Sequence, residues 1–174
     1  MRYTAFAPWE HYPKYLTHYE VTHPMYVLDE FFSLDSLSKH QDELNQWREW
    51  VLSDKPYKHK RHGPVSLQHT YNINVKLLEA MFLMLLEYQH EWPKPESVSE
   101  DWLKKEKEDW LYYPDNLSNK ELANPYRVIN KAFKAISLPE YREQLQDWLD
   151  EALTRRRVNE HIGARELNLS LIHI

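Results

Sequence analysis

Basic side chains are concentrated in two short stretches, and these have the clearest capacity for chemistry. The first stretch covers residues 55–62, where the candidate binding residues are Lys58, Lys60 and Arg61, with Tyr57 nearby. Lysine and arginine neutralise nucleic-acid phosphates, and tyrosine can stack on a base. The alternative is a solvated loop whose cations follow the carboxyl end of a helix, where positive charge is favourable. We favour the loop, because the formal net charge is −5.

The second stretch contains Arg155, Arg156 and Arg157, followed by His161. Arg156 and His161 have four residues between them, a spacing that resembles the Arg-x4-6-His signature of HEPN-type helical ribonucleases. The resemblance covers these two residues and implies RNA cleavage by a dimer; Arg157 stands where that family usually has a polar residue. Arg155 and Arg157 are further candidate contacts for an anion. We favour a charge cluster at a helix end over an RNA-cleaving site.

Ten histidines raise the question of a metal site. No His-Glu-x-x-His pair is present. His40 lies on the inner face of a predicted helix, which favours a packed core histidine over a metal ligand. The chain has no cysteine and two glycines, which excludes thiolate metal sites and glycine-rich phosphate loops. We therefore predict no metal, no cofactor and no catalytic set.

The elements that must position these residues recur along the chain. Residues 9–52 match residues 110–153 at a constant shift of 101, with identities at 13 of 44 positions. Ordinary residue frequencies would give about 3. The identities include two tryptophan pairs, Trp9 with Trp110 and Trp47 with Trp148. A shared helical periodicity would explain matched leucines, but it does not explain matched prolines, tryptophans and capping residues. The pattern predicts an internal duplication.

Each copy is predicted to form a short helix, a helix of about three turns and a longer amphipathic helix. Thr17-x-x-Glu20 and Ser118-x-x-Glu121 are capping boxes, which open the short helix in each copy. Between the copies, residues 67–91 are apolar almost all round and predict a central helix. Its expected most buried residues are Leu78, Met81, Phe82 and Leu85. A further helix is predicted at residues 99–111, with an inner face made of Trp102, Leu103, Trp110 and Leu111.

The predicted fold class is all-α, a helical bundle built from two tandem copies of this unit around a central apolar helix. Residues 1–168 form one domain in this interpretation. Residues 169–174, LSLIHI, resemble the translation of a transposase-type sequencing adaptor, so we interpret them as a non-native tail. The chain would then be a truncated metagenomic fragment, compatible with a longer repeat array. The alternative is a genuine apolar tail that packs on the bundle.

Truncation predicts an open apolar surface near residues 149–162, self-association, and few contacts for residues 163–174. Composition adds 42% hydrophobic and 28% charged residues, without an apolar run long enough to span a bilayer or to form a signal peptide. We therefore expect a cytoplasmic protein. Its motifs identify no named family. The favoured function is a non-catalytic protein-interaction module that binds a protein partner or itself. The alternative is an RNA-binding or HEPN-like RNA-cleaving protein that uses Arg156 and His161.

Overall fold

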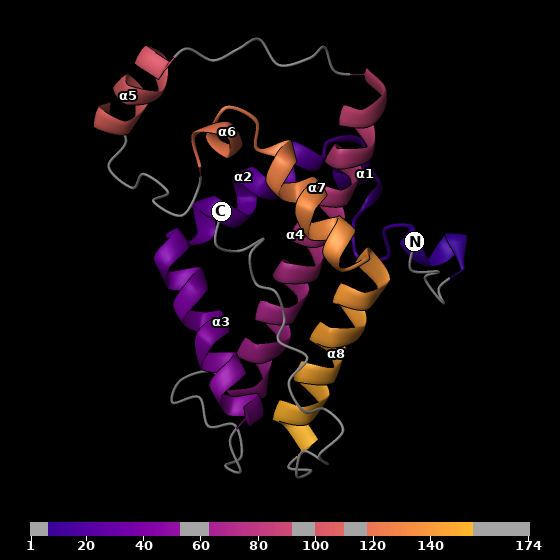
Figure 1. Ribbon diagram of the computed structural model, residues 1–174. Coiled ribbons are helices and arrows are strands. Elements are labelled where there is room, and N and C mark those ends of the chain that lie inside the picture. The colour runs from indigo at the N-terminus through magenta and orange to yellow at the C-terminus, as the bar shows by residue number, and fades with distance from the viewer. Residues whose placement is uncertain (1–6, 53–62, 92–99, 110–117, 155–174) are drawn as a thin grey trace.

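The computed structural model describes residues 7–52, 63–91, 100–109 and 118–154, and the regular structure in these ranges is entirely helical (Figure 1). The all-α fold class is confirmed. The described elements are the 3-10 helix η1 (Pro8–His11) and the α-helices α1 (His18–Thr22), α2 (Pro24–Leu34), α3 (Leu37–Leu52), α4 (Gly63–Glu91), α5 (Glu100–Asp109), α6 (Asn119–Leu122), α7 (Tyr126–Ala135) and α8 (Leu138–Thr154). Among them, none combines the length and the apolar character that a membrane-crossing helix needs.

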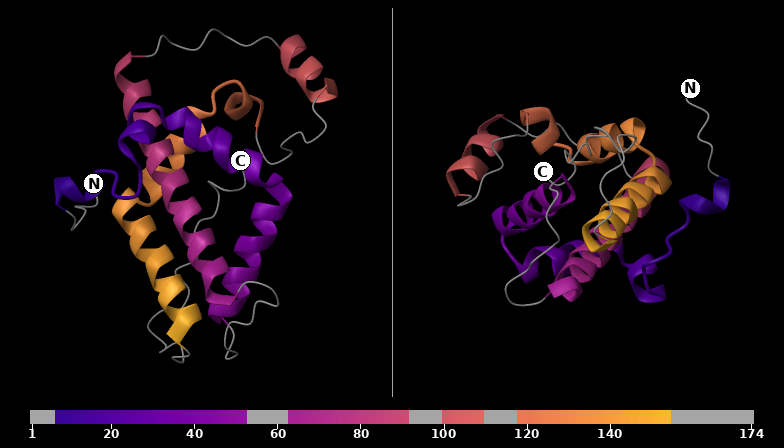
Figure 2. Two further views of the ribbon diagram at one scale, coloured as in Figure 1. Left: turned by 180° about the vertical axis from the view of Figure 1, so that it is seen from behind. Right: turned by 90° about the horizontal axis from the view of Figure 1, so that it is seen from below.

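Helix α4 is the centre of the bundle. It runs between α3 and α8 in Figure 1 and in the rear view of Figure 2, and its residues supply much of the buried core. Leu78, Met81 and Leu85 are buried, as predicted. Phe82 is only half-buried, so its predicted place among the most buried residues is wrong. Its ring lies at the edge of the core, against the rings of Phe133 and His11.

The helices on either side of α4 have the same order. Helices α1, α2 and α3 begin at residues 18, 24 and 37, and α6, α7 and α8 begin at residues 119, 126 and 138. Both predicted capping boxes form: the Thr17 amide donates to Glu20 Oε2 over 2.6 Å, and the Ser118 amide donates to Glu121 Oε2 over 2.9 Å. Trp47 and Trp148 are both buried, as predicted. The helix order agrees with the repeat register, while duplication itself stays a prediction.

Helix α5 differs most from expectation. It stands away from the bundle in Figure 1 and in both views of Figure 2. Trp102 is 49% exposed, so the prediction that it faces inward is wrong. Glu100, Asp101, Lys104 and Lys105 stand at i, i+4 spacing, which supports an exposed helix face. The other three predicted inner-face side chains, at positions 103, 110 and 111, lie outside the described residues.

Candidate interaction surface

None of the sequence-predicted binding or catalytic residues falls in the part of the chain that the structure describes. Lys58, Lys60 and Arg61 belong to residues 53–62, and Arg155, Arg156, Arg157 and His161 belong to residues 155–174. Residues 169–174, interpreted as a non-native tail, also lie outside the described residues. Of the open surface expected near residues 149–162, only residues 149–154 are described, where Leu149 is buried and Leu153 is exposed. These interpretations therefore stay predictions. Among the described residues, the most distinctive polar cluster lies elsewhere, between the N-terminal segment, α4 and α8.

That region is built on a buried carboxylate. Glu79 lies in the apolar part of α4 and is 0% exposed. Its Oε1 atom accepts a hydrogen bond from the Lys14 amide over 2.8 Å. Its Oε2 atom accepts from the amides of Tyr15, over 2.8 Å, and Leu16, over 3.2 Å. Three successive backbone N–H groups thus surround one carboxylate, which compensates for much of the hydration that the charge loses on burial.

Arg142 of α8 completes this buried cluster. One terminal guanidinium nitrogen lies 2.5 Å from Glu79 Oε1. The same nitrogen donates to the backbone oxygen of Tyr12, and the other donates to the backbone oxygen of Glu10, each over 2.6 Å. The guanidinium therefore binds the carboxylate and two carbonyls of one segment. We call residues 7–23 the N-terminal arm; Glu79 and Arg142 tie its backbone to α4 and α8.

Two side-chain contacts extend this attachment along α4. The hydroxyls of Tyr15 and Tyr71 lie 2.8 Å apart, and burial, together with this hydrogen bond, raises the pKa of Tyr71. Lys76 Nζ donates to Glu20 Oε1 over 2.6 Å. Burial of Glu20 acts to raise its pKa, but the hydrogen bonds from Lys76 and Thr17 outweigh burial, so the pKa is lowered. The arm is thus held chiefly by polar contacts.

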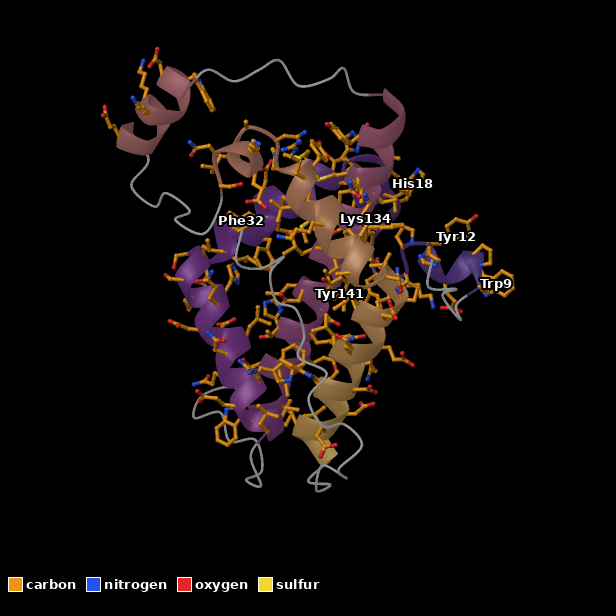
Figure 3. The ribbon with its side chains drawn as sticks, in the orientation of Figure 1. Trp9, Tyr12, His18, Phe32, Lys134 and Tyr141 are labelled. Carbon is orange, nitrogen blue, oxygen red and sulfur yellow. The ribbon has the colours of Figure 1, made fainter. Side chains whose placement is uncertain are left out.

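The arm exposes large aromatic side chains to solvent. Trp9 is 64% exposed and Tyr12 is 67% exposed, and Figure 3 shows both at the side of the bundle, pointing away from it. Tyr19 is also exposed; its ring stacks on His23 with a centroid distance of 4.5 Å and meets Tyr26 of α2 edge-on at 5.4 Å. We call these five residues the aromatic surface.

This arrangement is suited to binding. Tryptophan and tyrosine are enriched at protein interfaces, where they contribute much of the binding energy. Among the residues that the structure describes, no group of three side chains could hold a metal ion. His40 is a packed core residue, as predicted: Nε2 lies 2.9 Å from the Phe31 carbonyl oxygen, and the two rings stack at 4.0 Å.

Sequence reasoning missed both the anchor and the surface. Glu79 is the one acid within the apolar run of residues 77–86, and a charge in such a run signals a buried, paired group. Nothing in the sequence identified Arg142 as its partner. Trp9 is a repeat match of Trp110, but a repeat match does not show whether a side chain is buried.

Comparison with known proteins gives no assignment: no family model, no curated protein and no solved structure matches this chain.

Proposed function

We propose that this protein is a non-catalytic helical interaction module, which binds another protein through the aromatic surface of its N-terminal arm. One observation carries the proposal. The arm exposes Trp9, Tyr12 and Tyr19, while its backbone is fixed to the core by Glu79 and Arg142. A chain that needed these rings only for stability would bury them.

The fixed backbone matters for affinity. Association costs free energy for each loop and side chain that must be ordered on binding. The bonds to Lys14, Tyr15 and Leu16 order the arm in advance, so a partner would meet rings on a prearranged backbone. Tryptophan and tyrosine add large contact area with few rotatable bonds. Pre-organisation and aromatic composition together favour recognition.

The test is a selection of random peptides displayed on phage against the purified full chain, followed by fluorescence anisotropy with the enriched peptides. We expect the double variant Trp9→Ala/Tyr12→Ala to weaken binding by about tenfold or more, as loss of aromatic anchors does at other interfaces. Trp102→Ala is the matched control, because it removes an exposed tryptophan from α5, away from the arm. Its binding should equal that of the unchanged chain.

A second variant separates the rings from their attachment. Glu79→Gln keeps every aromatic residue but weakens the tie to the arm backbone, so affinity should fall less than in the double aromatic variant. Peptides that bind all these variants equally, or a selection without enriched peptides, would show that the aromatic surface is not a binding site. Sedimentation of the unchanged chain over a range of concentrations distinguishes a foreign partner from self-association.

We also propose that the two helical units arose by duplication. The support is the sequence register of 101, the matching helix order, and the capping boxes at Thr17 and Ser118. An experimental structure in which the backbones of residues 18–52 and 119–153 superpose closely would agree with this. Different helix geometry in the two segments would contradict it.

A further inference from the structure

Helices α2 and α7 carry corresponding apolar stripes, but the stripe on α2 is covered only at Leu28, which packs against the core. The corresponding pairs, 101 residues apart, are Met25 with Tyr126, Leu28 with Ile129, and Phe32 with Phe133. On α7, Ile129 is buried, and both aromatic rings pack against the core. On α2, Met25 is 53% exposed and Phe32 is 49% exposed. We call Met25, Leu28 and Phe32 the α2 stripe.

The α7 stripe is covered by two aromatic residues of α4. Tyr88 stacks on Tyr126 with a centroid distance of 4.2 Å and an angle of 6° between the rings. Phe82 meets Phe133 at 5.2 Å and 70°. These two α4 residues are six positions apart, so they lie about 9 Å apart along the helix and about 120° apart around it. The protein itself therefore shows which kind of element fits this stripe.

The α2 stripe is a second apolar face of its helix. Val27 and Phe31 already pack α2 into the core, so the helix does not need Met25 and Phe32 for its attachment. Figure 3 shows Phe32 on the opposite side of the bundle from Trp9. Phe32 of the stripe is thus remote from Trp9, whereas Met25 directly precedes Tyr26 of the aromatic surface in the sequence.

The neighbouring helix limits the length of the element that could cover the stripe. On α8, Leu149 is buried in the core. The residue 101 positions earlier, on α3, is Arg48, which is exposed. An apolar helix as long as α4 would place apolar side chains against this charge. The distance from Met25 to Phe32 is roughly 10 Å along the helix axis. A helix of about two to three turns covers that distance and ends before it reaches Arg48. Exposed Asp29 and Glu30 on α2 favour basic residues beside the aromatic pair.

We propose that the α2 stripe docks a short amphipathic helix of another protein, which carries two aromatic residues six positions apart and basic residues beside them. The docking mode repeats the contact that Phe82 and Tyr88 make with α7. The inference goes beyond the proposed function, because docking on the stripe needs neither Trp9 nor Tyr12.

The probe is a fluorescein-labelled peptide of about four helical turns with a lactam constraint, in which Phe and Tyr stand six positions apart on an Ala/Lys/Gln background. Titration with the full chain, followed by anisotropy, should show saturable binding in roughly the micromolar range, the strength expected of a few aromatic contacts. Phe32→Ala should weaken it by about tenfold. Tyr12→Ala is the matched control: it removes an exposed ring from the arm and should leave this binding unchanged, so the two proposals fail independently.

The control peptide has both aromatic residues replaced by alanine and should not bind. The proposal is overturned if that peptide binds equally well, if the aromatic peptide does not saturate at millimolar protein, or if Phe32→Ala binds as the unchanged chain does. Circular dichroism checks that the variant is folded, and Met25→Gln serves the same purpose if it is not. Sedimentation covers the remaining occupant: self-association that Phe32→Ala abolishes would assign the stripe to a second copy of this chain.

Discussion

Trp47 and Trp148, which occupy the same position in the two helical units, pack directly against each other. The indole N–H of Trp47 donates to the backbone oxygen of Trp148 over 3.3 Å, and the rings meet edge to face with centroids 5.7 Å apart. Edge-to-face geometry places the positive edge of one ring on the negative face of the other. The contact joins α3 to α8 and brings together residues 101 apart in the sequence.

Replacing either tryptophan by alanine should therefore destabilise the fold strongly. We expect Trp47→Ala and Trp148→Ala each to lower the free energy of unfolding by about 3–5 kcal/mol, from lost burial and the cavity that remains. In urea denaturation the double variant should lose less than the sum of the single losses, because each single change already breaks the shared contact. Strict additivity would mean that the two rings stabilise the fold independently.

Loss of the Glu79 charge should be severe and should affect the arm first. Glu79→Gln leaves Arg142 buried without its counter-charge, and breaking such a pair typically costs about 3–5 kcal/mol. Hydrogen exchange should show the amides of Lys14, Tyr15 and Leu16 losing protection earlier than those of α4. The double variant Glu79→Leu/Arg142→Leu is the control and should recover part of the loss. Unchanged protection at these amides in Glu79→Gln would contradict the role of the carboxylate.

The lowered pKa of Glu20 predicts a specific response to acid. A carboxyl group with a lower pKa in the folded state stabilises the fold above its unfolded pKa, near 4.5, and loses this contribution as the pH falls through the folded pKa. Stability should therefore decline below about pH 4.5. Glu20→Gln should remove this part of the decline, as seen by thermal unfolding at a series of pH values. Lys76→Met, which removes the partner, should reduce it as well.

Tyr141 predicts a response at high pH. Burial raises its pKa to about 12, and its hydroxyl has no hydrogen-bond partner among the described residues. A phenol with a raised pKa favours the fold below its unfolded pKa of 10.0, and this contribution is lost as the pH rises toward 12. Tyr141→Phe removes a buried polar atom without a partner, so it should be neutral or stabilising at pH 7. It should also lose less stability than the unchanged chain between pH 10 and 12.

Helix positions were predictable because local chemistry determines them. Glu20 and Glu121 accept from the Thr17 and Ser118 amides at helix starts whatever the tertiary fold, and Pro24 suits the first position of a helix. The central place of α4 followed from its apolar circumference, since such a helix must be surrounded.

Packing partners were less predictable. Phe82 and Trp102 were both expected inside, but how far each is covered depends on which helix lies beside it, and that is a tertiary property. The same holds for Met25 and Tyr126, which share a position in the repeat and differ in exposure. The partner of Glu79 is Arg142, on a helix far along the chain, so no local pattern could identify it.

The attachment of the arm also has a consequence for biosynthesis. Glu10 is bonded to a guanidinium 132 residues further along the chain. Ribosomes add about 5–20 residues each second, so Glu10 is synthesised roughly 7–26 s before Arg142. During that interval the nascent chain carries Trp9 and Tyr12 on a backbone without this clamp. The arm takes its final shape only after α8 has been translated. A partner that binds only the clamped arm would therefore bind chains in which α8 is complete and not shorter nascent chains.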